Sequence, residues 1–379
     1  MRWPWGRPWV MIAEVVSLGE PKGDCMTDDA NAIHFTYLSQ EDLLEAGCLD
    51  FRMAVDAAAQ VLLAHRDGDV MFPDKIVQIF DQQTQERINC LPATLTREKV
   101  CGVKWVSVFP PNVPRYGLQN LTAIFVLSEI ERGFPLAVLE GTLASNARVG
   151  AMGALAAQHF APADARTIGF IGAGEQAKMH LLAMKTVRPS LAECRVAALT
   201  PFEEDTFVAE LAPVLPDMVF VPTGGDRARA MSDADILVTA TSAQAPLLQA
   251  EWMKPGSFYS HVGGWEDEYA VAQQCDTIVC DDWETVKHRT QTLSRMYAEG
   301  LLGDDDIHAN LGDVVSGDKP GRRSEDERVY FNAVGLSYVD VALALAMYRR
   351  AVDAGRGTRL TMQETTVFRH PRIATHVRM

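Results

Sequence analysis

The sequence lacks several features that mark specialised classes of protein. None of its 379 residues fall in an apolar run of about 20, so no transmembrane helix is expected. The seven cysteines are scattered without any C-x-x-C pair, which argues against a disulfide framework or a zinc site; we expect free thiols in a reducing cytoplasm and no bound metal. Basic residues are scarce, with 35 Lys and Arg against 50 Asp and Glu. The resulting net charge of −15 disfavours binding to nucleic acid.

The composition that remains is that of a globular protein with room for two domains. Apolar residues make up 47% and charged residues 22%, close to the average for such chains. The first 26 residues carry a short apolar run that Glu14 interrupts, and no cleavage site of small residues follows it. We therefore predict that residues 1–26 form a leader that is not packed on the rest of the chain.

Two patterns divide the remaining chain. Residues 27–148 combine helical spacing after Ser39 with short segments rich in Val, Ile and Phe, which predicts helices on a mixed or antiparallel sheet. Residues 149–326 begin in an Ala-rich helix and then alternate strand with helix, which is typical of a doubly wound parallel sheet of the Rossmann type. From Val329 the pattern returns to helix. The predicted fold is α/β, with a discontinuous α+β domain made of residues 27–148 and 327–379.

One glycine-rich segment has the pattern of a dinucleotide site. Gly172, Ala173, Gly174, Glu175 and Gln176, followed by an alanine, give G-x-G-x-x-A between a buried strand and a helix. The first glycine permits the tight turn, and the second lets a pyrophosphate approach the backbone. The helix N-terminus then offers free N–H groups to the phosphates. The alternative is a tight turn without a ligand.

The choice of cofactor depends on the end of the second strand, where NAD enzymes usually place an acidic residue that binds the ribose. This sequence has Thr200 there, with Glu203 and Glu204 just beyond, and no arginine that would hold a 2′-phosphate. We therefore expect NAD, with NADP left open. Residues at the ends of two later strands are predicted to line the crevice beside the nicotinamide: Thr239, Ala240, Thr241, Ser242, Val262 and Gly263.

Several blocks together resemble the ornithine cyclodeaminase/mu-crystallin family. They occur in the family's order between about residues 70 and 350, and include CGVKWVSVFPPN, SNARVGAMGALAA, IGAGEQA, DILVTATSAQAPLL, HVGGWEDE and ERVYFNAVGLSYVDVALA. The resemblance implies a domain that binds substrate and forms a homodimer, followed by a Rossmann domain. It also implies hydride transfer between NAD(P) and the α-carbon of an amino or imino acid.

Three cations match family positions. By resemblance, Lys104 and Arg148 bind the substrate carboxylate, Lys104 assists proton transfer, and Lys75 stands where many members have an arginine with the same role. The residues themselves agree, because Lys104 lies in an apolar strand where an unpaired cation is costly, and a substrate carboxylate would be a natural partner. The guanidinium of Arg148 suits a carboxylate bidentately. The alternatives are an exposed edge-strand lysine, an arginine in an ion pair between domains and, for Lys75, a solvated strand end.

The sequence departs from the family where cyclodeaminases have two acidic residues. Trp265 follows the paired glycines in place of an aspartate, so Glu266 or Asp267 would take its catalytic role or else cap the next helix. Asn89 replaces a second acid. His261 is a further candidate acid or base, although a structural role is favoured for it.

Three functions follow from these expectations. The first is an NAD(P)-dependent oxidoreductase acting on a small amino or imino acid, such as an amino acid dehydrogenase or an imine reductase, with opine-like substrates included. The second is an ornithine or lysine cyclodeaminase, which the loss of both carboxylates disfavours. The third is a protein of the mu-crystallin type that binds NAD(P)H without turnover.

Overall fold

The structure is a computed structural model in which residues 32–378 are described, so the predicted leader, residues 1–26, lies outside the described residues. The chain divides into a main unit, His34–Leu360, and a second unit whose described parts are residues 32–33 and 361–378. Residues 361–378 contain two short helical segments, η3 (Val367–Arg369) and α13 (Ile373–His376), with mostly exposed side chains. The main unit holds every candidate site residue.

The first sheet of the main unit is built mainly from the predicted short strands. Its order is β18 (Thr358–Gln363), β1 (Ile33–Leu38), β7 (Pro135–Glu140), β6 (Leu121–Glu129), β5 (Val100–Val108), β4 (Glu86–Leu95) and β2 (Val70–Met71), with β3 (Ile76–Asp81) also paired to β4. β4 to β7 form an antiparallel meander. Alternate residues of β5 and β6 are buried, because one face of the sheet packs on helices.

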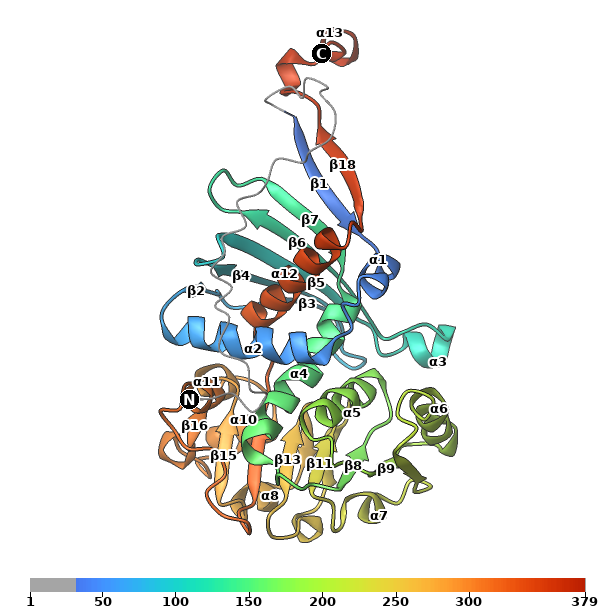
Figure 1. The fold of residues 1–379 in the computed structure, drawn as a ribbon, viewed down its shortest axis with the longest axis vertical. Helices are drawn as coiled ribbons and strands as arrows, with labels where there is room; N and C mark the ends of the chain where they lie inside the picture. Colours follow the sequence, from blue (N-terminus) through green and yellow to red (C-terminus); the bar gives the residue numbers. More distant parts are fainter. Residues whose placement is uncertain (1–31, 379) are drawn as a thin grey trace. The chain divides into compact units, whose positions relative to one another are not determined.

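Helices cover the buried face of this sheet. α1 (Gln40–Glu45) starts at a capping box between Ser39 and Asp42. α2 (Phe51–Arg66) starts at Asp50, whose carboxylate accepts two backbone N–H groups. α12 (Ser337–Asp353) packs on β4, β5 and β6, and a short α3 (Asn112–Tyr116) follows β5 (Figure 1).

The second sheet confirms the predicted Rossmann-type fold class. Its strands are all parallel, in the order β10 (Val219–Pro222), β9 (Glu193–Ala197), β8 (Thr167–Ile171), β11 (Ile236–Thr239), β13 (Phe258–His261), β17 (Val329–Asn332), β15 (Thr277–Cys280) and β16 (Ala309–Asn310). The chain runs from β8 outward to β10 and then returns to β11 on the other side of β8. This reversal is the switch point at which such sheets bind ligands.

The connections of the second sheet are short helices and one small sheet. The helices are α5 (Glu175–Val187), α6 (Pro201–Leu211), α7 (Arg227–Met231), α8 (Tyr269–Gln273), α9 (Trp283–Val286), α10 (Thr292–Ala298) and α11 (Leu311–Ser316), with the 3-10 turns η1 (Ala250–Trp252) and η2 (Asp304–Asp306). β12 (Gln244–Leu248) pairs with β14 (Trp265–Asp267) beside the main sheet.

The predicted return to helix at Val329 is wrong. Val329–Asn332 is the buried strand β17, which lies between β13 and β15, and helix α12 begins only at Ser337. The parallel sheet therefore continues past residue 326, where the sequence predicted it to end. The four residues Val-Tyr-Phe-Asn are too few to separate a buried strand from the start of an apolar helix by periodicity.

Helix α4 (Thr142–Phe160), the predicted Ala-rich helix, connects the two sheets and is buried along most of its length (Figure 1). It contacts β6 of the first sheet, and α5, β13 and β17 of the second. Its small residues permit this close approach. A Cβ atom added to Gly150 would lie 2.7 Å from the carbonyl oxygen of Met179 in α5.

We expect Gly150→Ala to lower the free energy of unfolding by about 1–3 kcal/mol, because the methyl group forces α4 and α5 apart. Chemical denaturation measures the change. Gly303→Ala is the matched control, since its Cβ would meet Asp306 at an ordinary 3.6 Å. Equal stability of the two variants would contradict the close packing of α4 on α5.

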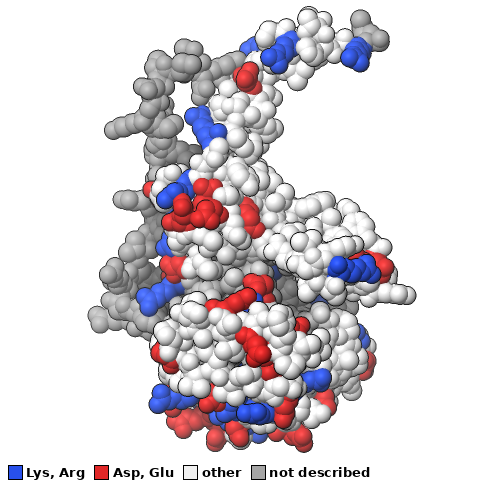
Figure 2. Space-filling model, turned by 90° about the vertical axis from the view of Figure 1, so that its right-hand side faces the viewer, with Lys and Arg blue, Asp and Glu red and all other residues white. Residues whose placement is uncertain are grey.

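Acidic and basic side chains are interspersed over the face drawn in Figure 2. The cysteines within the described residues are free thiols. Between residues 32 and 378, no helix has the length and apolar character needed to cross a bilayer, and no cluster of three potential metal ligands is present.

Candidate active site

The predicted dinucleotide turn lies at the switch point, between β8 and α5. Gly172 has φ +105°, and a Cβ atom there would lie 2.5 Å from the carbonyl oxygen of Ala240, so only glycine fits. Gly174 faces open space and is the N-cap of α5, without a side-chain cap. The first N–H groups of α5, including those of Glu175 and Gln176, are therefore free to bind an anion. The turn fits a dinucleotide pyrophosphate.

The carboxylates of the two glutamates after β9 accept hydrogen bonds from backbone N–H groups. Thr200 is the N-cap of α6, in a capping box with Glu203. The buried carboxylate of Glu204 accepts hydrogen bonds from the N–H groups of Ala198, Gly224 and Gly225 at 2.7–3.0 Å. Both glutamates therefore stabilise the turns after β9 and β10 and are not free to bind a ribose.

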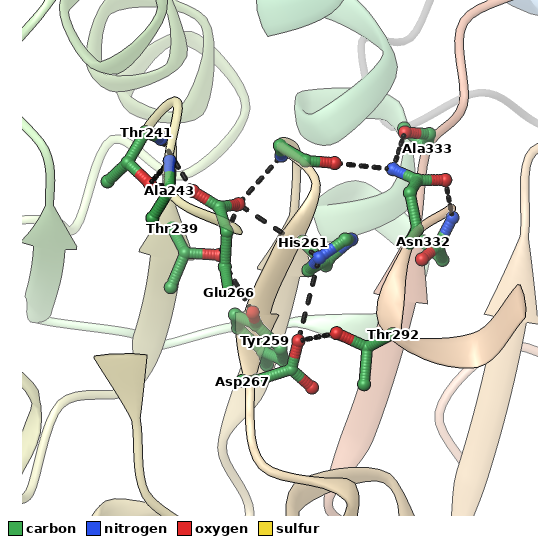
Figure 3. Close-up of polar contacts among 12 residues, drawn as sticks. Thr239, Thr241, Ala243, Tyr259, His261, Glu266, Asp267, Thr292, Asn332 and Ala333 are labelled. Atoms are coloured by element: carbon green, nitrogen blue, oxygen red, sulfur yellow. Dashed lines mark hydrogen bonds and ion pairs between the residues drawn. The ribbon is translucent and has the colours of Figure 1, made fainter. Parts of the chain in front are cut away.

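Glu266 joins the two loops that follow β11 and β13 (Figure 3). Its buried carboxylate accepts hydrogen bonds from the Thr239 hydroxyl at 3.0 Å, from the N–H of Thr241 at 2.6 Å and from the N–H of Gly263 at 2.7 Å. The hydroxyls of Thr239 and Thr241 thus face Glu266, and any contact of these residues with a cofactor would come from their backbone. Ala240, Ser242 and Val262 lie in the same two loops.

Asp267 is also fully buried, beneath the same loops (Figure 3). It accepts hydrogen bonds from Thr292 at 2.6 Å and from Tyr330 at 2.9 Å, and burial raises its pKa to about 7. His261 Nε2 lies 3.5 Å from its carboxylate, and burial lowers the pKa of the imidazole to about 4, so the ring is neutral. The expectation that Glu266 or Asp267 caps the next helix is wrong. Glu268 is the N-cap of α8, and both acids point into internal networks because the short strand β14 carries them inward.

Lys104 and Arg148 meet at a buried carboxylate. Lys104 Nζ, on β5, forms an ion pair with Asp340 Oδ2 of α12 at 2.7 Å and donates a hydrogen bond to Ser145 Oγ at 3.2 Å. Arg148 Nε, on α4, binds the other oxygen of Asp340 at 2.6 Å. The alternative of an exposed edge-strand lysine is therefore wrong, because Lys104 is buried on β5, which lies between β4 and β6. Arg148 does form an ion pair, and it shares Asp340 with Lys104. The partner of Lys104 in this structure is Asp340, where the sequence pointed to a substrate carboxylate.

The free end of Arg148 faces the parallel sheet. Its Nη1 and Nη2 atoms lie 2.7 and 2.9 Å from the position that a Cβ of Gly335 would take, in the loop after β17. Asp281, at the end of β15, holds this loop by accepting the N–H groups of Val334 and Gly335 at 2.9 Å. Within residues 32–378 no hydrogen bond or ion pair occupies either Nη atom. Both can therefore bind a carboxylate.

The positive charges of this region lower the pKa of the two lysines among them. Lys75 precedes β3, and burial together with the charges of Arg289, Arg87 and Arg148 lowers its pKa to about 8. Burial and the charge of Arg148 likewise lower the pKa of Lys104 to about 8, against the attraction of Asp340. An amine with such a pKa can exchange a proton near neutral pH.

The first turns of α4 connect the cations to the dinucleotide turn. Ser145 contacts Lys104, and Arg148 lies one turn further along the helix. Between them, the buried Asn146 accepts a hydrogen bond from Gln176, in the first turn of α5, at 2.7 Å. Four consecutive helical positions thus fix the cation cluster beside the segment predicted to bind pyrophosphate.

The residues that orient this cluster are Ser145, Asn146 and Asp340, and none of them was predicted from the sequence. Asp340 carries the signal that would have identified it, because a carboxylate within the apolar run Ser337–Met347 must be buried with a partner. Ser145 and Asn146 carry no such signal, since short polar residues are common in helices. Their roles depend on which elements pack beside α4.

These features define a class of protein: a dinucleotide-binding α/β protein in which a buried cluster of cations lies beside the nucleotide turn. The sequence profile of the ornithine cyclodeaminase/mu-crystallin family matches residues 41–355. The chain belongs to this family.

Individual relatives cover most of the chain. The N-((2S)-2-amino-2-carboxyethyl)-L-glutamate dehydrogenase of Staphylococcus aureus is 27% identical over 86% of this chain and 98% of its own length. The Δ1-pyrroline-2-carboxylate reductase of Thermococcus litoralis, solved with NADH and L-proline, has a TM-score of 0.81 at 27% identity, over 86% of this chain and 99% of that one. An archaeal alanine dehydrogenase dimer with bound NAD has a TM-score of 0.78 at 28% identity, over 87% and 100%.

Proposed function

We propose that this protein is an NAD-dependent oxidoreductase that converts a small imino acid to an amino acid, or the reverse. The observation that carries the proposal is the linkage through α4: Lys104, Arg148 and the dinucleotide turn are held together by Ser145, Asn146 and Asp340. The relatives compared above act on amino or imino acids, which supports the same chemistry here.

Each cation of the cluster has a separate role in this proposal. Arg148, fixed through Nε by Asp340, binds the α-carboxylate of the substrate with its two Nη atoms. Lys104 Nζ gives a proton to the imine nitrogen during reduction and takes one from the amine during oxidation. Lys75 adds positive charge to the cavity that the segment before β3 lines together with Arg289 and Gly335.

The dinucleotide turn holds the cofactor in this proposal. Gly172, Ala173 and Gly174, with the N–H groups of Glu175 and Gln176, bind the pyrophosphate, and the loops joined by Glu266 border the nicotinamide. When bound, the nicotinamide supplies the hydride that the α-carbon receives during reduction. NAD is favoured because Thr200 stands where a 2′-phosphate would need a cation, and because the two solved relatives contain NAD or NADH.

Glu266 and Asp267 act as positioning residues in this proposal. Glu266 keeps the loops after β11 and β13 in place, and Asp267 supports them from below. No hydrogen bond or ion pair joins either acid to Lys75, Lys104 or Arg148 within the described residues. The cyclodeaminase alternative, which needs an acid at the substrate amine, therefore gains no support.

Turnover with NADH tests the proposal directly. The purified protein is mixed with 2-oxo acids plus ammonium, with Δ1-pyrroline-2-carboxylate and with opine-type imines, and absorbance at 340 nm is followed. We expect NADH consumption with at least one of these. Ammonia release from ornithine or lysine without a net change at 340 nm would show a cyclodeaminase, whereas tight NADH binding without any turnover would show a binding protein of the mu-crystallin type.

We also propose that the first sheet, with α2 and α12, binds substrate and forms a homodimer, and that the parallel sheet, β17 included, binds the dinucleotide. The outer face of the first sheet exposes the apolar side chains of Tyr37, Trp105 and Ile124, and Trp105 pairs with Ile124 across β5 and β6. Large apolar side chains exposed on one face are typical of a surface that another protein chain covers. A cytoplasmic location belongs to the same proposal, and the free cysteines favour it.

We expect Trp105→Glu to dissociate the dimer, because the substitution places a carboxylate at the centre of an apolar interface and does so in both copies. Sedimentation velocity should show the dimer mass for the unmodified protein and the monomer mass for the variant. Phe202→Glu, at a residue of α6 that is 77% exposed, is the control and should remain dimeric. A dimer that persists in Trp105→Glu would place the interface elsewhere.

A further inference from the structure

The cation cluster contains more positive charge than one α-carboxylate requires. Lys75, Arg87, Lys104, Arg148 and Arg289 are close enough for their charges to interact with one another directly or through a neighbour. Asp340 is the carboxylate that pairs with members of this group, and it pairs with Lys104 and Arg148 alone. Three cations therefore remain without a carboxylate partner among the described residues.

Arg289 is the most informative of these three. It lies in the turn between α9 and α10, and its side chain is half-buried. Its Nε atom is buried without a hydrogen-bond partner, and no ion pair involves its guanidinium in the described part of the chain. A buried, unpartnered guanidinium nitrogen is costly unless a ligand supplies the missing acceptor.

The position of Arg289 relates it to the substrate. One cavity is lined by Lys75 and Arg289 on opposite elements, together with Leu91 of β4 and Gly335. Gly335 also borders the Nη atoms of Arg148, so this wall of the cavity separates it from Arg148 by a single glycine. Asp74 is the acidic residue of the lining, but its side chain is exposed and no ion pair joins it to either cation.

The face of β4 that lies beside Lys104 becomes polar toward the start of the strand. Leu91, Asn89 and Arg87 occupy alternate positions of β4 and so share one face, with Leu91 paired to Lys104 and Arg87 to Val108. The side-chain oxygen of Asn89 is buried without a partner. Leu91 lines the cavity, and along this face of β4 the side chains change from apolar at Leu91 to the amide of Asn89 and then to the guanidinium of Arg87.

We propose that the substrate is an amino or imino dicarboxylate, whose second carboxylate is bound by Arg289 with support from Lys75 and Arg87. This inference rests on the proposed function, since it assigns the substrate class of the same site. Arg148 binds the α-carboxylate, and Arg289 binds the distal one across the cavity. A monocarboxylate of equal length would leave Arg289 without an acceptor, so the site selects against it.

A binding experiment tests the second carboxylate without depending on turnover. Succinate and butyrate have four carbons each and differ by one carboxylate, and isothermal titration measures the affinity of the protein for each. We expect succinate to bind at least about 100-fold more tightly than butyrate. In Arg289→Gln this ratio should fall at least about 10-fold.

The control variant is Lys287→Gln, which removes one positive charge from the same turn. Lys287 forms ion pairs with Glu284 and Asp304 and does not line the cavity, so the ratio should stay at the value of the unmodified protein. Equal affinity for succinate and butyrate would overturn the proposal. So would a ratio that Lys287→Gln lowers as much as Arg289→Gln, or an Arg289→Gln variant that alters only the oligomeric mass.

Turnover assays then separate this inference from the proposed function. With NADH and ammonium, oxaloacetate should be reduced with a kcat/KM at least about 100-fold above that of 2-oxobutyrate, and Arg289→Gln should reduce the ratio. Faster turnover of 2-oxobutyrate would overturn the substrate class and leave the oxidoreductase standing. Selective binding of succinate without turnover of any acid would leave the second carboxylate site standing and overturn the oxidoreductase.

Discussion

Lys104→Met should lower kcat by about 10²–10⁴-fold, the range that loss of a general acid or base usually produces. Methionine has a similar length and leaves Asp340 paired with Arg148, so the fold should persist. Stopped-flow measurement of NADH oxidation gives kcat, and fluorescence titration should show an unchanged affinity for NADH. A loss of less than 10-fold would mean that Lys104 only balances the charge of Asp340.

The proposed role of Lys104 also predicts the direction in which kcat changes with pH. Reduction requires the protonated amine of Lys104, so kcat should fall as pH rises through its pKa of about 8. Oxidation requires the neutral amine, so kcat in that direction should rise through the same pH. Because the pKa of Lys75 is also lowered to about 8, Lys75→Met is the necessary control and should retain the limb in kcat. If the pH dependence of kcat disappears in Lys75→Met, the titrating group is Lys75 and not Lys104.

Arg148→Gln should raise KM for the acid substrate and lower kcat/KM by about 10²–10³-fold. The glutamine amide cannot offer two charged N–H groups to one carboxylate, and hydrogen bonds to charged groups contribute about 1.5–3 kcal/mol each. Initial-rate kinetics over a range of substrate concentrations measure the change.

Arg148→Lys is the matched variant, because it keeps the charge and the ion pair with Asp340 but loses the fork. We expect an intermediate kcat/KM. Arg148→Gln has no charge to pair with Asp340, so a higher thermal unfolding temperature for Arg148→Lys than for Arg148→Gln shows that the ion pair is kept. If Arg148→Lys equals the unmodified protein, the guanidinium geometry has no part in binding.

The strongest predictions from the sequence were those that local chemistry requires. The tight turn at Gly172 was predictable because a glycine pair between a buried strand and a helix has few other uses, and Gly172 has a positive φ in the structure. A partner for Lys104 was predictable because a cation in an apolar strand must be neutralised. The α/β fold class followed from the alternation of strand and helix.

What the sequence left undecided is which distant segments meet. Asp340 lies 192 residues after Arg148, and no local pattern shows that its carboxylate accepts both Arg148 and Lys104. No local pattern shows that the side chains of Glu266 and Asp267 point into the protein either, because the pairing of β14 with β12 sets their orientation. Strand β17 was missed because a short buried segment has no periodicity of its own.

The sequence by itself therefore determined the α/β class, the glycine turn after β8 and the need of Lys104 for a partner, because glycine geometry and the cost of burying charge act locally. Only the tertiary structure decided how the cations of the cluster are shared. The packing of α4 between the sheets makes Asp340 the common partner of Lys104 and Arg148, and it leaves the Nε of Arg289 buried beside the cavity without one.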